Sequence, residues 1–228
     1  MSLLGQTWAI LGKEMLVSWK GRARVLSVAL FGVVTLLLFY FAAGPDTEMA
    51  RKGAPAFLVL ALLMTSTLAL TESIRTETED GALETLLLLP IDPAALFLAK
   101  ALSTTLLLCF LAPILVPLAL ALFGSALSGK SALLLAVLWF LAAAALAAPG
   151  TLYSAMTART TGQDVLLPVM LFPLVVPVII ASVKAMGLVL LGDAMDSLNS
   201  WLAVLGVFDL VYWSIGTIFA GYVLEERR

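Results

Sequence analysis

Six long stretches without an acidic or basic residue constrain the fold of this chain more than any other feature. A helix needs roughly 20 apolar residues to cross a hydrocarbon layer about 30 Å thick. The stretches are residues 25–45, 53–71, 101–129, 131–158, 165–183 and 201–224, of which only the last is interrupted, by Asp209. Since 62% of the residues are hydrophobic and 12% charged, one water-soluble core could not hide the apolar side chains. The sequence predicts an all-α integral membrane protein with six transmembrane helices, built as a single domain over residues 1–228.

Several classes of protein are disfavoured by what the sequence lacks. The net charge of −2 offers no basic field for nucleic acid. There is no histidine, the commonest metal and haem ligand, and the one cysteine cannot form an internal disulfide. No phosphate-binding Gly-Lys loop, paired acid and base or Ser/His/Asp set is recognisable. We therefore expect no enzyme activity, metal site or cofactor in this chain alone.

The distribution of lysine and arginine predicts the orientation. If the N-terminus is cytoplasmic, nine of the 13 basic residues lie on the cytoplasmic side and four on the other, so both termini are expected inside. A cleaved signal peptide is disfavoured for the first stretch, because the apolar run exceeds a signal core of 7–15 residues. The inner set is Lys13, Lys20, Arg22, Arg24, Arg75, Lys100, Arg159, Arg227 and Arg228; the outer set is Arg51, Lys52, Lys130 and Lys184.

Residues 1–24 precede the first span and have their own pattern. Trp8, Leu11, Met15 and Trp19 recur at helical spacing, with charged residues elsewhere on the helical wheel. This is typical of an interfacial amphipathic helix lying on the lipid of the inner leaflet. A simple polar lead-in to the first span is the alternative.

The longest break between spans, residues 72–93, combines charge with leucine. Glu77, Asp80 and Glu84 share one helix face by their spacing, and Leu83 and Leu87 lie on another side. A loop that only turns does not need the leucines, so we favour docking to a partner over a merely solvated loop. The residues expected at this coupling loop are Glu72, Arg75, Glu77, Glu79, Asp80, Gly81, Leu83, Glu84, Leu87 and Pro90. Asp92 and Pro93 then form a good N-cap and first-turn pair for the third span.

Residues 70–100 resemble the signature segment of the haem exporter protein B (CcmB) family. That segment has an acidic pair, Gly-x-Leu-Glu, further leucines and a proline, and a Leu-Ala-Lys begins the next helix. An Ala-Pro-Gly late in the fourth span and the sequence ARKGAPAF at residues 50–57 also agree. The matching residues are Glu79, Asp80, Gly81, Leu83, Glu84, Leu86, Leu89, Pro90, Leu98, Ala99, Lys100, Ala148, Pro149 and Gly150.

The resemblance implies an ABC-2-type permease subunit in c-type cytochrome biogenesis, in the bacterial cell inner membrane. It implies that residues 72–93 act as a coupling helix that inserts into an ABC ATPase subunit, where ATP is hydrolysed. The further implied partners are a haem-handling membrane protein, a small single-span subunit, a periplasmic haem chaperone and a second permease copy in a homodimer. Haem is then the cargo of the complex.

Other polar and helix-bending residues leave alternatives open. Asp209 is an intramembrane acid, and we favour a structural pair with Lys184 over a functional site. Pro168, Pro173 and Pro177 in the fifth span fit either a hinge or ordinary packing. Residues 187–200 on the outer side are interpreted as a shallow helix between the fifth and sixth spans.

Two rival functions remain. A generic ABC-2-type exporter of a lipid or small molecule would share the coupling loop. An ion-coupled transporter would instead use Asp209 and need no ATPase.

Overall fold

The computed structural model describes residues 3–44, 47–79, 92–124, 129–157, 163–192 and 197–225. Within these ranges every regular element is an α-helix, and six helices are long and apolar enough to cross a membrane, which confirms the six predicted spans. The helices are α1 (Leu3–Lys20), α2 (Arg22–Ala43), α3 (Thr47–Glu79), α5 (Pro93–Phe123), α6 (Gly129–Thr157), α7 (Gln163–Leu191) and α8 (Leu198–Glu225).

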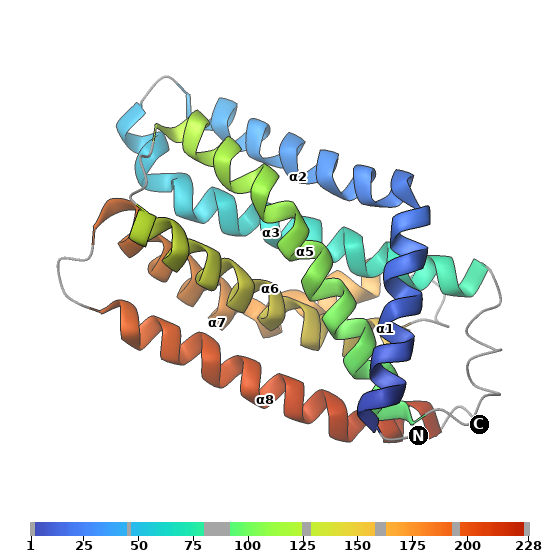
Figure 1. Cartoon of the computed structure of the whole chain (residues 1–228). Coiled ribbons are helices and arrows are strands. Elements are labelled where there is room, and N and C mark those ends of the chain that lie inside the picture. Colours follow the sequence, from blue (N-terminus) through green and yellow to red (C-terminus); the bar gives the residue numbers. More distant parts are fainter. Residues whose placement is uncertain are drawn as a thin grey trace.

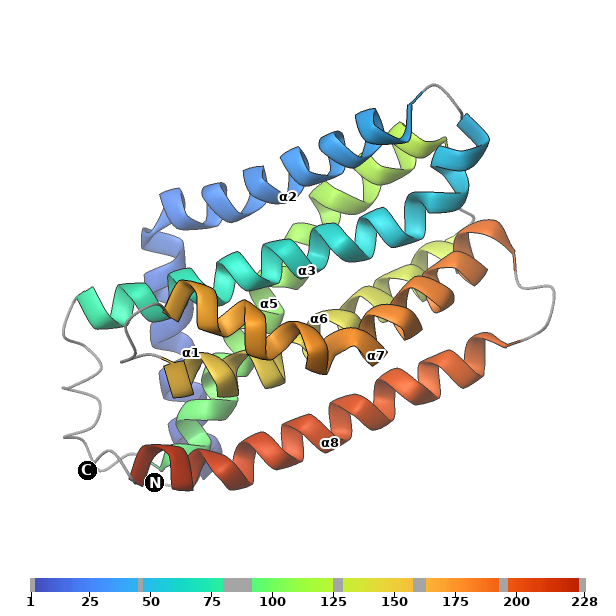
Figure 2. The same ribbon diagram turned by 180° about the vertical axis from the view of Figure 1, so that it is seen from behind.

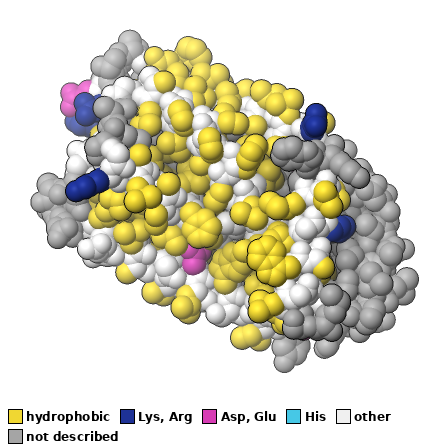
Figure 3. Space-filling view, viewed as in Figure 1, with side chains coloured by type: hydrophobic (Ala, Val, Ile, Leu, Met, Phe, Trp, Pro, Cys, Tyr) yellow, Lys and Arg dark blue, Asp and Glu magenta, His cyan; other side chains and the backbone are white. Residues whose placement is uncertain are grey.

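The six spans lie side by side as a bundle, and α1 crosses it at one end (Figure 1). We call this the α1 end; α3 finishes there and α5 begins there. From behind, α3 and α7 lie between α2 and α8 (Figure 2). Because the number of spans is even, α8 returns to the α1 end. Hydrophobic side chains cover the middle of one face of the bundle, with lysine and arginine towards its two ends (Figure 3).

α6 is the central helix of the bundle. All of its residues from Ala142 to Thr151 are buried, and it packs against α3, α5, α7 and α8. The many alanines allow the neighbouring backbones to approach closely, which is the usual way in which helices pack in membranes. Buried Trp139 of α6 donates a hydrogen bond from Nε1 to the carbonyl oxygen of Leu108 in α5 (3.0 Å).

The helices extend beyond the charge-free stretches from which we predicted them. α5 begins at Pro93 and includes Lys100, and α7 continues past Lys184 to Leu191. A single lysine does not stop a membrane helix, because its long side chain can reach polar surroundings. The described parts of residues 187–200 do not form the separate shallow helix that was expected: residues 187–191 belong to α7 and residues 198–200 to α8.

Candidate coupling surface

Four of the ten candidate coupling residues lie in the part of the chain that the structure describes, at the α1 end. We predicted a loop for residues 72–93, but residues 72–79 form the last turns of α3. These turns project past the neighbouring helices (Figure 2). They include Glu72, whose side chain is half-buried, and the backbone positions of Arg75, Glu77 and Glu79. The other candidates lie outside the described residues: Asp80, Gly81, Leu83, Glu84, Leu87 and Pro90.

The base of this projecting part of α3 is fixed against α6. Leu70 is 2% exposed, and its Cδ1 atom occupies the space in which a β-carbon on Gly150 would lie. Ala148, Pro149 and Gly150 are all buried. Of these three residues, Gly150 provides the position without a side chain that Leu70 fills where α3 leaves the bundle.

α5 starts at the same end with a well-formed cap. Asp92 has an extended backbone, and its Oδ1 accepts a hydrogen bond from the backbone nitrogen of Ala94 (2.9 Å). The predicted N-cap role of Asp92, with Pro93 following it, is confirmed. The backbone nitrogen of Asp92 also donates to Oε1 of Gln6 in α1 (3.0 Å). The role of Gln6 could not be predicted from the sequence, because a lone glutamine on an amphipathic helix has no distinguishing pattern.

α1 packs on the first turns of α5 through a small apolar cluster. Ile10 and Leu11 of α1 contact Ala95 and Ala99 of α5, and all four side chains are buried. The predicted stripe on α1 is therefore divided: Leu11 faces α5, whereas Trp8 is 71% exposed and Met15 is 49% exposed. The exposed residues still provide an apolar surface beside the packed one.

The predicted pair between Lys184 and Asp209 is not formed. Both carboxylate oxygens of Asp209 are buried and have no hydrogen-bond partner among the described residues, while Lys184 is exposed on α7. At 1.5 Å per residue, Asp209 lies about 16 Å from the start of α8 and Lys184 about 10 Å from the end of α7. The Lys184 amine and the Asp209 carboxylate thus lie at different depths along the bundle, so neither neutralises the charge of the other.

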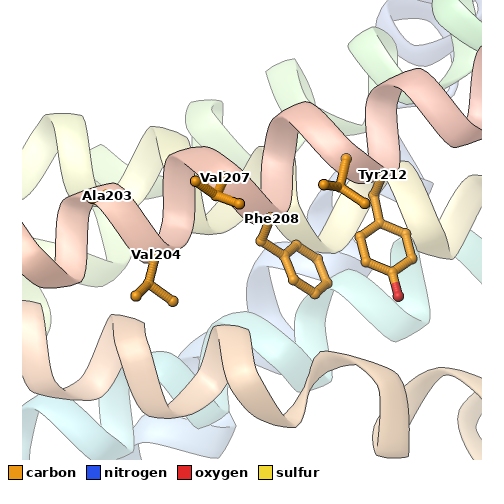
Figure 4. A pocket seen from close by; sticks show the side chains of 6 residues that line it. Ala203, Val204, Val207, Phe208 and Tyr212 are labelled. Carbon is orange, nitrogen blue, oxygen red and sulfur yellow. The ribbon is translucent and has the colours of Figure 1, made fainter.

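A hollow of about 450 Å³ runs along α8. Phe208 and Tyr212, whose rings stack at 4.3 Å between centroids, point from α8 towards α7 (Figure 4). The lining is apolar apart from the Tyr212 hydroxyl group: Ala203, Val204, Val207, Phe208, Val211 and Tyr212. Such a surface accommodates a lipid chain or an apolar side chain and has no metal ligand among its residues.

A bundle of six spans with a helix crossing one end and a span projecting beside it is the architecture of a multi-pass membrane protein. Residues 5–225 match the family model described as CcmB protein. The chain therefore belongs to the CcmB family, as the resemblance indicated.

Curated relatives agree with this assignment. The chain is 28% identical over 201 residues to heme exporter protein B of Pseudomonas aeruginosa, covering 88% of this chain and 89% of that protein. It is 30% identical over 175 residues to heme exporter protein B of Haemophilus influenzae, covering 75% and 76%. The match to heme exporter protein B of Escherichia coli strain K12 is 32% identical over 96 residues and spans 42% of this chain and 44% of that protein.

Proposed function

We propose that this chain is the membrane permease subunit of an ATP-driven complex in c-type cytochrome biogenesis. In this proposal it lies in the bacterial inner membrane with the α1 end in the cytoplasm, where a separate ABC ATPase subunit docks. A haem-handling membrane protein and a small single-span subunit complete the complex, which delivers haem to, or releases it from, a periplasmic chaperone. The observation that carries the proposal is the family match over residues 5–225.

The arrangement of the α1 end supports coupling through residues 72–93. The last turns of α3 project from the bundle, and α5 re-enters it at Asp92, so both ends of this segment are held at one end of the molecule. A partner that moved the segment would pull on two spans together. α3 would transmit that displacement to α6 through the Leu70–Gly150 contact.

We assign haem to the complex as cargo and give this chain a mechanical role. The relatives are named as heme exporters, which supports haem as the transported or released molecule. The absence of histidine means that axial ligation by imidazole must come from a partner. Large buried side chains such as Trp139, Leu108 and Leu146 fill the centre of the bundle.

The test is to reverse the acidic pair with Glu79→Lys and Asp80→Lys together. We expect loss of ATPase association, or loss of cytochrome c maturation despite association, because breaking a charged contact in an interface typically costs about 2–5 kcal/mol. Co-purification of the ATPase and holo-cytochrome yield are measured at matched expression. The amount of folded subunit should stay near normal, since surface substitutions usually change stability by less than about 0.5 kcal/mol.

The control for this test is Lys130→Glu, which also reverses a charge and lies at an exposed position at the opposite end of the bundle. It should leave both readouts unchanged. Full ATPase binding and full maturation in the Glu79→Lys/Asp80→Lys variant would show that the acidic run is only a solvated segment.

Asp209 distinguishes this proposal from an ion-coupled transporter. Asp209→Asn keeps the size of the side chain but removes its charge. We expect cytochrome c maturation to persist in this variant, because the proposed energy source is ATP hydrolysed by a partner. Abolished maturation with normal protein level and normal ATPase association would favour the ion-coupled alternative. A generic exporter of a lipid or small molecule would be favoured if deleting the gene left cytochrome c maturation intact.

A further inference from the structure

The residue at which the chain returns to the bundle, Asp92, is held by three hydrogen bonds. Its side chain caps the backbone nitrogen of Ala94, and its carbonyl oxygen accepts from the backbone nitrogen of Leu96 (3.2 Å). Its own backbone nitrogen donates to the side chain of Gln6 in α1. The first two bonds lie within α5, and the third comes from a helix 86 positions away in the sequence.

The hydrogen bond that Gln6 accepts replaces a hydrogen bond that a capped helix often makes within itself. In a capping box, a Glu or Gln at the third helical position accepts a hydrogen bond from the backbone nitrogen of the N-cap residue. In α5 the N-cap is Asp92, Pro93 follows it, and the third helical position is Ala95. Alanine has no acceptor in its side chain. Gln6 supplies from α1 the oxygen that α5 lacks.

The same alanine explains how α1 comes close enough to do this. Ala95 is fully buried and packs against Ile10 and Leu11 of α1. Gln6 lies one helical turn before Ile10, on the same side of α1. A glutamate or glutamine at position 95 would supply the acceptor but would fill the space that α1 occupies. Ala95 and Gln6 are thus two parts of one helix cap, divided between two helices.

We propose that Gln6 is a positioning residue that holds Asp92, the first residue of α5's cap, against α1 and makes α1 and the start of α5 move as one unit. This deepens the proposed function, on which its role in coupling depends. A single residue, Gly21, separates α1 from α2: its nitrogen donates to the carbonyl oxygen of Val17 (2.8 Å), and its carbonyl oxygen accepts from the nitrogen of Arg24 (3.0 Å). A displacement at Asp92 is therefore passed to α1 and on to α2.

The link is tested first without any partner. The purified full chain is placed in lipid nanodiscs, and hydrogen–deuterium exchange is measured on proteolytic peptides. Exchange at the Asp92 amide is obtained by comparing a peptide that contains Asp92 with an overlapping one that lacks it. Residue 93 is proline and has no amide hydrogen, so it adds no exchange signal next to that of Asp92. Gln6→Met keeps the length of the side chain but removes the acceptor. We expect exchange at Asp92 to accelerate by about fivefold, the factor that matches a hydrogen bond of ordinary net strength.

Two further variants separate the link from a general change in α1. Gln6→Glu retains an acceptor oxygen near the N-terminal end of a helix, where negative charge is favourable, and should restore slow exchange. Gly12→Ala lies on the same helix with open space around its position, and should leave exchange at Asp92 unchanged. Equal exchange in the wild-type chain and the Gln6→Met variant would overturn the proposal.

The role in coupling is tested in cells by holo-cytochrome yield at matched protein level. Gln6→Met should lower the yield and Gln6→Glu should restore it. Accelerated exchange at Asp92 with a full yield would show that the bond exists but positions nothing of consequence, which also overturns the proposal. The proposed function is judged separately by the Glu79→Lys/Asp80→Lys variant, whose result does not depend on Gln6.

Discussion

Two glycines lie where side chains of neighbouring helices approach closely. In α8, a β-carbon added to Gly216 would overlap the edge of the ring of Phe97 of α5, whose side chain is 5% exposed. In α2, a β-carbon on Gly32 would lie 2.9 Å from Oγ1 of Thr65 and 3.1 Å from Cδ2 of Leu115. Each glycine is therefore required by the close approach of two helices. Since packing rather than the hydrophobic effect drives helix association in lipid, these positions contribute strongly to stability.

Gly216→Ala should destabilise the chain. Placing a methyl group against Phe97 is overpacking, which typically costs about 1–3 kcal/mol and exceeds the gain of about 1 kcal/mol from better helix propensity. The matched control is Gly206→Ala on the same helix, where nothing lies within 4 Å of the new β-carbon. Unfolding of both variants in detergent is compared with the wild-type chain. A Gly216→Ala variant as stable as Gly206→Ala would contradict the assigned contact.

At this scale the sequence predicted some residues and not others. The Asp92–Pro93 cap could be predicted because it depends on neighbours in the chain. The partner of Gln6 could not, because it lies in another helix. The Lys184–Asp209 pair was expected because both residues were assigned to the outer side. Whether two such charges meet also depends on their depth in the bundle and on which side of its helix each lies, and this pair is not formed. The role of Gly150 needed the structure, because only there is Leu70 seen in the space that the glycine leaves.

Among the elements, α3 shows most clearly what a hydrophobicity pattern can and cannot predict. The charge-free stretch of residues 53–71 identified a span but not its ends, since α3 runs from Thr47 to Glu79. The pattern reports the part of a helix that meets hydrocarbon, whereas backbone hydrogen bonds continue wherever local residues permit them. The charged residues after Thr71 were therefore assigned to a loop although the first of them are helical.

Breaking the helix in the projecting part of α3 should impair coupling to the ATPase without impairing folding of the subunit. Proline in a helix interior costs about 3 kcal/mol or more locally, so Thr76→Pro should disrupt the last turns of α3 while leaving the span inserted. We expect loss of ATPase co-purification at a normal level of membrane-inserted subunit. Thr47→Pro at the first position of the same helix is the control, because proline is tolerated there. Unchanged ATPase association in Thr76→Pro would show that the helical continuation is not needed.

For the whole molecule, the six spans and the crossing α1 place the chain ends on one side. The sequence predicted the number of spans correctly because each is long and apolar enough to be recognised alone. It could not predict the arrangement in which α6 is surrounded by four other spans, since nearly all of its residues are apolar and no side of it is marked. Periodicity is informative only where one side of a helix differs from the other.

The orientation of the bundle is predicted by the nine-to-four bias of lysine and arginine. After replacement of the native Cys109, single cysteines are introduced as Glu79→Cys and Lys130→Cys. A membrane-impermeant maleimide applied to spheroplasts should label position 130 at once and position 79 only after the membrane is permeabilised. Labelling of position 79 from outside would place the coupling surface beyond the reach of any cytoplasmic ATPase.

The peripheral position of α8 has a consequence for how the protein is made. α8 has the lowest mean hydropathy of the six spans and the smallest share of buried residues, and it contains Asp209, whose carboxylate has no hydrogen-bond partner in the part of the chain that the structure describes. Of these six spans it is also the last to be translated. Since an intramembrane acid makes insertion of a lone helix costly, we expect α8 to insert against a surface that the five earlier spans present. α8, the span that depends most on its neighbours for insertion, is thus translated after them.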